Sequence, residues 1–340
     1  MQTLVSHLQL RSDLEPAQVA EAVAQLVSPQ VAEEDKADFL RALREKGETA
    51  EEIAAFARAL LARAVDPQLD PARLRGPMLD VCGTGGDRME LFNISTTSMF
   101  ILAAGGAVVV KHGNRAITSQ CGGADVLEAL GVRIDLPPAD LKRCVETLGL
   151  GFVFAPAYHP AFKAIVPVRK RLAAEGTPTI FNMLGPLLNP AQPAHQLVGI
   201  FAKSLLPKYA QALSSLGRER AWAVHGDGTD ELAISAASDV WEVSSGGLRE
   251  FQVDARELGI ASANAQSLRG GDRAENSRTL VAILDGTKHG PKRDVVALNA
   301  AAGFVVAGLS PDLASGLDLA RKQIESGRAL RKLSELQAFQ

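Results

Sequence analysis

The chain has 340 residues, of which 46% are hydrophobic and 22% are charged, so it can fill the cores of about two domains. Its formal net charge of -3 argues against proteins that coat nucleic acid or acidic membranes, since those need a basic surface. Cys82, Cys121 and Cys144 form no CxxC pair, so we expect a reducing cytoplasm and no disulfide framework or zinc site. We also expect no signal peptide and no membrane span, because the longest apolar run, 99–110, is shorter than the roughly 20 residues a bilayer requires.

Residues 1 to about 70 predict helices, with apolar residues at helical spacing in PAQVAEAVAQLV, DKADFLRALR and AEEIAAFARALLARAV. From there the pattern alternates between helical segments and short β-rich runs, and beyond about residue 274 it returns to long helices. This rhythm predicts an α/β protein with a small all-helical domain, 1–72, and a larger α/β domain, 73–340, whose mostly parallel sheet is flanked by helices. The predicted strands are 78–82, 108–111, 151–155, 197–201 and 221–225.

Ligands of open α/β sheets bind beyond the carboxyl ends of the strands, so the loops after residues 82, 111 and 225 are the candidates for a site. The first of these loops is the glycine loop, GTGGD at 83–87, which is followed by NIST at 93–96 at the start of a helix. Glycine backbone N–H groups and a helix N-terminus favour phosphate oxygens. By itself, an ordinary tight turn with a serine N-cap explains the loop as well. The loop matches neither a Walker A sequence nor GxGxxG.

The second loop, which we call the basic loop, runs from Lys111 to Asp125 and leaves its strand as KHGNR. Two cations, an imidazole, an amide and two hydroxyls in this loop suit a ligand with several negative charges. A solvated polar loop is the alternative, but two anion-suited loops on consecutive strands should open onto the same edge of the sheet.

The third loop, HGDGTDE at 225–231, ends in the adjacent carboxylates Asp230 and Glu231. Adjacent carboxylates repel each other unless a cation lies between them. Beside phosphate-binding loops the expected cation is Mg²⁺, which usually bridges one or two carboxylates to substrate phosphates. Taken alone, a polar turn is the commoner explanation of such a sequence.

Seven segments of the chain together resemble the anthranilate phosphoribosyltransferase family. The resemblance implies transfer of the phosphoribosyl group of 5-phosphoribosyl 1-pyrophosphate to the amino group of anthranilate, giving N-(5-phosphoribosyl)anthranilate and pyrophosphate in tryptophan biosynthesis. It also implies that part of 159–190 packs on the helical domain and that this domain mediates a homodimer. The segments are GTGGD (83–87), NIST (93–96), KHGNR (111–115), ADVLEALG (124–131), HPAFKAIVPVRK (159–170), TIFNMLGPLLNPA (179–191) and HGDGTDE (225–231).

The resemblance also implies roles for individual residues, none of them a discrete catalytic acid or base. Anthranilate would contact Gly83, Asn114 and Arg169, and Mg²⁺ would be held by Ser95, Asp230 and Glu231. The chain departs from the family pattern at Arg88, Leu91, 120–123 and Pro178. The residues implied for phosphoribosyl pyrophosphate are Gly83, Gly86, Asp87, Leu91, Asn93, Ile94, Ser95, Thr96, Lys111, His112, Gly113, Asn114, Arg115, Ala116, Ile117, Thr118, Ser119 and Gly123.

Two other functions compete with this interpretation. A pyrimidine nucleoside phosphorylase shares the fold, but it uses inorganic phosphate and has no need for a metal site at Asp230 and Glu231. A non-catalytic relative that binds nucleic acid is disfavoured by the acidic net charge and by the intact KHGNR segment. Among the histidines, His112 is the one expected to contact substrate because of its place in the basic loop.

Overall fold

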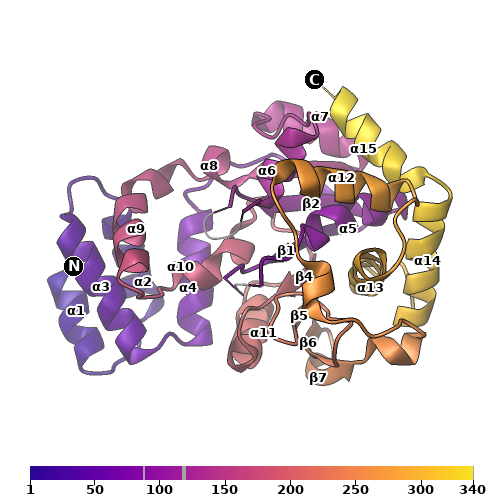
Figure 1. Ribbon diagram of the computed structural model, residues 1–340. Coiled ribbons are helices and arrows are strands. Elements are labelled where there is room, and N and C mark those ends of the chain that lie inside the picture. The colour runs from indigo at the N-terminus through magenta and orange to yellow at the C-terminus, as the bar shows by residue number, and fades with distance from the viewer. Residues whose placement is uncertain (87–88, 117–119, 340) are drawn as a thin grey trace.

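The structure is a computed structural model that describes residues 1–86, 89–116 and 120–339. Figure 1 shows a bundle of helices, which contains the N-terminus, beside a larger unit built on a sheet that is covered by helices. The last helix of the chain lies at the far end of the larger unit. The predicted fold class is confirmed.

The helical bundle forms because each of its helices buries one apolar stripe. Thr49 caps α4 by accepting a hydrogen bond from the Glu52 backbone N–H at 3.1 Å, and Ile53 and Phe56 then face inward. A second segment, which includes Val168 and Leu172, shares the same buried cluster. The boundary between residues 72 and 73 stays a prediction. The helices of the bundle are α1 (Gln2–Gln9), α2 (Pro16–Leu26), α3 (Glu33–Lys46), α4 (Ala50–Leu61), α9 (Val166–Ala174) and α10 (Phe181–Leu184).

The sheet has seven strands in the order β3-β2-β1-β4-β5-β6-β7. Strands β1 to β5 are parallel and correspond to the five predicted strands, whereas β6 and β7 form an antiparallel hairpin at one edge that the sequence analysis did not predict. The sequence of β7 has no continuous apolar run, and most of its side chains are exposed. The strands are β1 (Met78–Gly83), β2 (Val108–Gly113), β3 (Leu150–Phe154), β4 (His195–Gly199), β5 (Arg220–Gly226), β6 (Ser238–Ser244) and β7 (Gly247–Val253).

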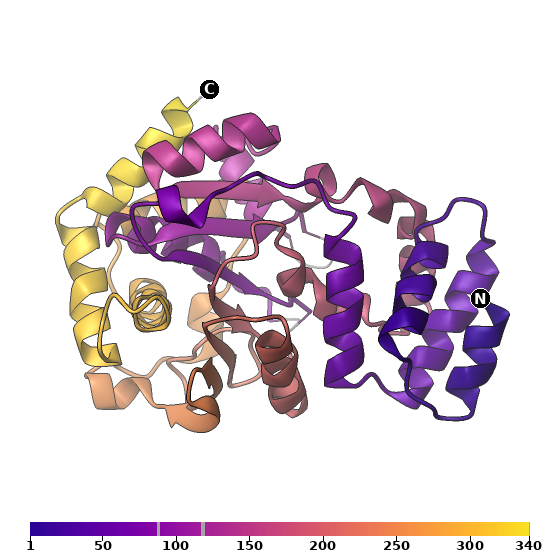
Figure 2. The same ribbon diagram turned by 180° about the vertical axis from the view of Figure 1, so that it is seen from behind.

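The central strands β1, β2 and β4 are almost wholly buried because both faces of the sheet are covered. Val81, for example, belongs to the buried cluster that includes α5 and α13, while its neighbour Cys82 belongs to the cluster that includes α11 and the bundle. Figure 2 shows α11 between the sheet and α4. The remaining helices are α5 (Ile94–Ala104), α6 (Gly123–Ala129), α7 (Pro138–Leu148), α8 (Ala155–Tyr158), α11 (Leu206–Ser215), α12 (Arg273–Leu284), α13 (Pro291–Val306), α14 (Leu313–Glu325) and α15 (Arg328–Ala338).

The order of the strands reverses between β1 and β4. The chain proceeds from β1 to β2 on one side of this point and from β4 to β5 on the other, which creates the crevice where open α/β sheets usually bind ligands. The glycine loop and the basic loop follow β1 and β2, and the Asp230 segment follows β5. Within the described ranges, no helix has the length and apolarity that a membrane crossing requires.

Candidate active site

The acidic pair lies against the glycine loop. The Asp230 Oδ2 atom accepts a hydrogen bond from the Gly85 backbone N–H at 2.7 Å. A Cβ atom at Gly83 would approach the same oxygen to 2.2 Å, so only glycine leaves room for the carboxylate. Gly85 and Gly86 have φ angles of +66° and +84°, which side chains rarely tolerate. Residues 145 positions apart in the chain are thus joined at the crevice between β1 and β4.

Two further features hold the acidic segment in place. A Cβ atom at Gly199, the last residue of β4, would lie 1.5 Å from the Asp230 carbonyl oxygen. On the opposite side, the buried Asn299 of α13 accepts from the Leu232 N–H and donates to the Leu232 carbonyl, both at 3.0 Å. The backbone that carries Asp230 and Glu231 is therefore fixed by packing and by hydrogen bonds on both sides.

Lys111 extends from β2 to the start of α5. Its Nζ atom donates to the carbonyl of Val81 and lies 3.3 Å from the Ser95 hydroxyl, and its side chain is almost completely buried. Ser95 lies in the first turn of α5, where backbone N–H groups are left without helical acceptors. A buried ammonium group and a helix N-terminus therefore share one place at the sheet edge, and both favour an anion.

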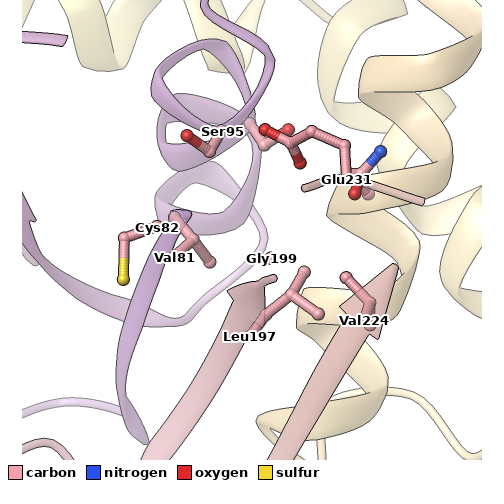
Figure 3. Close-up of a pocket in the computed structure, with 9 residues that line it drawn as sticks. Val81, Cys82, Ser95, Leu197, Gly199, Val224 and Glu231 are labelled. Carbon is pink, nitrogen blue, oxygen red and sulfur yellow. The ribbon is translucent and has the colours of Figure 1, made fainter. Parts of the chain in front are cut away.

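Ser95 and Glu231 line the same small cavity, together with Val81, Gly199 and Asn299. Figure 3 shows the Glu231 side chain extending across the strand ends towards the helix that carries Ser95. Within the described ranges, no three His, Cys, Asp or Glu residues gather into a metal-binding group. The side chains of Glu231 and Ser95 offer a carboxylate and a hydroxyl oxygen to this cavity. They suit a hard cation such as Mg²⁺, which keeps several waters and takes its other ligands from a substrate phosphate.

The basic loop packs against the start of α5. A Cβ atom at Gly123 would lie 2.9 Å from the Thr96 hydroxyl and 3.8 Å from the Lys111 side chain, so the absence of a side chain at 123 allows this contact. Arg115 pairs with Glu128 through two hydrogen bonds of 2.6 and 2.9 Å. Its guanidinium is therefore held over α6 by an acid.

His112 follows Lys111 in β2, and its side chain is buried. Its Nδ1 atom lies 3.1 Å from the Gly185 carbonyl, and its buried Nε2 atom has no hydrogen-bond partner among the described residues. Burial, and second the neighbouring His159, lower the pKa of His112 to about 3. Its ring is therefore neutral at physiological pH, and Nε2 carries an unshared lone pair when Nδ1 donates to Gly185.

A series of ring contacts connects His112 to Arg169 in the helical bundle. The ring centroids of His112 and His159 are 5.4 Å apart, Phe162 follows at 5.4 Å, and Phe181 follows at 5.7 Å. The Arg169 guanidinium lies 5.1 Å from the centroid of Phe181. Arg169 forms no ion pair with any described residue, and burial lowers its pKa. An anion would supply the charge partner that its surroundings do not.

The remaining predicted residues are distributed as follows. Asp87, Ile117, Thr118 and Ser119, like Arg88, lie outside the described residues. Asn93, Ile94, Ser95 and Thr96 lie at or within the first turn of α5; Gly113 ends β2; Asn114, Arg115 and Ala116 follow it; and Leu91 bridges to Arg269.

Comparisons with known proteins agree with this geometry. The family model described as "Glycosyl transferase family, helical bundle domain" matches residues 2–64, and that described as "Glycosyl transferase family, a/b domain" matches residues 75–330. An anthranilate phosphoribosyltransferase of Roseiflexus castenholzii is 47% identical over 95% of this chain and 94% of its own length. The chain belongs to the anthranilate phosphoribosyltransferase family. The resemblance inferred from the seven segments is thereby confirmed.

Solved structures of the family extend the comparison. The anthranilate phosphoribosyltransferase of Thermus thermophilus has a TM-score of 0.92 and 40% identity, covering 99% of this chain and 98% of that one. The enzyme of Saccharomyces cerevisiae, solved in complex with PRPP and Mg, has a TM-score of 0.87 and 27% identity, covering 98% and 97%. The two-domain architecture of the family is therefore shared over nearly the whole chain.

Three residues to which the sequence analysis assigned no role hold segments of the candidate site in place. Asn299 fixes the acidic segment, Asp125 binds the backbone of the basic loop, and Asn276 donates to the Asn93 side chain at 3.1 Å. Asn299 could have been noticed as a polar residue within the apolar stretch 295–306 of α13, and Asp125 as an acid in the first turn of a helix. Asn276 carries no comparable signal in the sequence.

Proposed function

We propose that this protein transfers the phosphoribosyl group of phosphoribosyl pyrophosphate to the amino group of anthranilate. One observation carries the proposal within the family. The carboxylate of Asp230 is bound to the glycine loop, beside the place where the Lys111 ammonium meets Ser95 at the start of α5. A cation site and an anion site side by side are what a metal-bound diphosphate requires.

Mg²⁺ is the cofactor we propose, held by Asp230, Glu231 and Ser95 together with the phosphates of the donor. When bound, it would neutralise negative charge that develops on the departing pyrophosphate. The support is the hard oxygen donor set in this chain and the Mg present with PRPP in the related yeast structure.

The residues of this chain contribute mainly by positioning and electrostatics. Anthranilate's aromatic amine is weakly basic and unprotonated at neutral pH, so attack on the ribose requires little help from a base. The difficult event is departure of pyrophosphate. Lys111, fixed by Val81 and Ser95, presents a preoriented positive charge to that group, and the N–H groups of the α5 N-terminus act in the same sense. Holding the amine in line with the leaving group supplies much of the remaining acceleration.

Arg169 is the proposed partner of the anthranilate carboxylate. The desolvated guanidinium on the Phe181 ring offers charge and two parallel donors, which match a carboxylate. The adjacent rings of Phe162 and His159 offer an apolar face to the benzene ring of the acceptor.

A pyrophosphate-release assay tests the proposal directly. The protein is supplied with phosphoribosyl pyrophosphate, Mg²⁺ and each of the three aminobenzoate isomers in turn. We expect release with the ortho isomer, anthranilate, and loss of release when the metal is chelated. A protein that instead cleaves pyrimidine nucleosides with inorganic phosphate and no Mg²⁺ would be a phosphorylase, and the proposal would be wrong.

The domain boundary, the oligomeric state and the cellular location also remain proposals. We propose division into domains at residues 72 and 73, because the cluster that includes the bundle takes its first members from Leu4 to Leu60, whereas the buried members of the other cluster begin at Met78. We propose a homodimer through the helical bundle, where Leu10 and Val166 are exposed, and light scattering would measure it. We propose a cytoplasmic setting because all three cysteines are free and buried.

A further inference from the structure

Both ends of the basic loop meet at one carboxylate oxygen. The Asp125 Oδ2 atom accepts hydrogen bonds from the backbone N–H of Ala116 at 2.8 Å and from that of Gly122 at 2.9 Å. These two donors lie six positions apart in the chain. The Asp125 side chain is 4% exposed, so water competes little for either bond.

The two ends of the loop also pack closely against each other. A Cβ atom at Gly122 would lie 2.4 Å from the Ala116 nitrogen, and the Ala124 N–H donates to the Asn114 carbonyl at 3.2 Å. A second contact comes from Asn93, the N-cap of α5, whose side chain donates a hydrogen bond to the Cys121 carbonyl at 3.0 Å. The described parts of the loop are therefore fixed relative to each other and to the start of α5.

The other oxygen of Asp125 faces two arginines. Its Oδ1 atom lies 3.0 Å from Arg273 Nη2 and 3.6 Å from Arg115 Nη1, and it accepts no hydrogen bond from the described residues. Both arginines also approach Glu128, at 3.6 and 2.6 Å. Capping α6 requires only the bond from Gly122. The bond from Ala116 and the two balancing cations go beyond what a helix cap needs.

We propose that Asp125 is a positioning residue for the phosphoribosyl donor. It contacts no reacting atom; it acts by holding the Asn114–Ala116 backbone at a fixed distance from Gly122 and Gly123, which pack beside Lys111 and Thr96. This inference rests on the proposed function, because it assumes that the basic loop binds the phosphates. Loss of the carboxylate therefore weakens donor binding, and it reaches the acceptor only through Asn114, which the family resemblance also assigns to anthranilate.

The test compares Asp125→Ala with Asp312→Ala in steady-state kinetics and thermal unfolding. Asp312 is a matched control because it caps α14, accepting from the Ser315 N–H at 2.8 Å, on a helix remote from the sheet edge. Both variants should lose stability, since each loses a helix cap. Only Asp125→Ala should raise the KM for phosphoribosyl pyrophosphate, by about tenfold, which corresponds to one or two buried hydrogen bonds. The KM for anthranilate should rise by less than about threefold, because the acceptor carboxylate is assigned to Arg169 in the helical bundle and only Asn114 connects this loop to the acceptor.

A second substitution keeps the test decisive if Asp125→Ala does not fold. The amide oxygen of Asp125→Asn can still accept from both Ala116 and Gly122, while its NH₂ group faces the arginines, so we expect a rise in donor KM of only about threefold. The proposal would be wrong if the donor KM were unchanged in the alanine variant, or in the asparagine variant where the alanine variant does not fold. Asp125 would then act only as a helix cap. A wild-type protein that releases no pyrophosphate would refute the proposed function itself, which is a separate result.

Discussion

The sheet edge and the helical bundle contribute to the candidate site in different ways. At the sheet edge, glycine backbone, a buried lysine and Asp230 are tied together by short hydrogen bonds and by contacts that admit no Cβ atom. On the bundle side, the side chain of Arg169 rests on the Phe181 ring and meets no acid among the described residues. The first region has a preorganised backbone, and the second has one desolvated charge.

This difference corresponds to the two proposed substrates. A diphosphate has many oxygens in a fixed arrangement and gains from several oriented donors, whereas a benzoate has one carboxylate and a flat apolar ring. If the assignment is right, substitutions at the sheet edge act on the donor and on catalysis, and substitutions in the bundle act on the acceptor. Each of the following predictions tests that division.

The largest effect is expected from Asp230→Asn combined with Glu231→Gln. Removing both charges should lower kcat/KM by roughly 10³-fold, because about 4 kcal/mol of metal-dependent stabilisation of the leaving group is lost. The measurement is turnover as a function of Mg²⁺ concentration. The matched control is Asp318→Asn with Glu325→Gln, which removes the same charge from the exposed surface of α14. Equal turnover of the two double variants at limiting Mg²⁺ would remove the metal assignment.

An intermediate effect is expected from Arg169→Ala. Loss of a charge-assisted pair in a desolvated site should raise the KM for anthranilate by about 10- to 100-fold and should change the KM for phosphoribosyl pyrophosphate by less than about twofold. Arg171→Ala is the control on the same helix, since the Arg171 guanidinium already pairs with Glu34 at 2.9 Å. An equal rise in both KM values for Arg169→Ala would contradict the division between the two regions.

The smallest effect concerns His112, which lies where the two regions meet. Burial first, and His159 second, lower the pKa of His112 from 6.5 to about 3. The unfolded chain therefore binds a proton below about pH 6.5 that the folded chain refuses, so stability is complete above that pH and is lost as the pH falls towards 3. For this one group, lowering the pH from 6.5 to 5.5 should cost about 1 kcal/mol of unfolding free energy.

The test is urea unfolding of His112→Asn at both pH values. Asparagine can keep a donor for the Gly185 carbonyl but does not titrate, so the variant should lose about that much of the wild-type dependence on pH. His289→Asn, at an exposed histidine, serves as the control. A variant whose stability depends on pH as strongly as that of the wild type would show that His112 is not protected from protonation.

Much of the fold could be predicted because its signals are local. The apolar spacing of residues 1 to 70 and the runs that became β1 to β5 depend only on neighbours in the chain. The hairpin of β6 and β7 was missed although its pairing is local, since most of β7 is exposed and the strand has no continuous apolar run. In the site, the glycine loop and the acidic pair were recognisable by residue type. Their contact through Gly85 was only an expectation, because 145 positions separate the partners.

The sequence by itself determined the composition of the site: backbone N–H groups, a lysine, hydroxyls and two acids, all at or beyond the carboxyl ends of buried strands. Only the tertiary structure decided how these groups are held. The order of the strands brought the ends of β1 and β4 together, and close packing left no space for a Cβ at Gly83 or Gly199. It also turned Asp125 and Asn299 towards backbone groups of other segments. The Asn299 contact spans 67 positions of the chain, and the contact of Asp125 with Ala116 closes a loop of nine, so neither follows from the spacing of a helix or a strand.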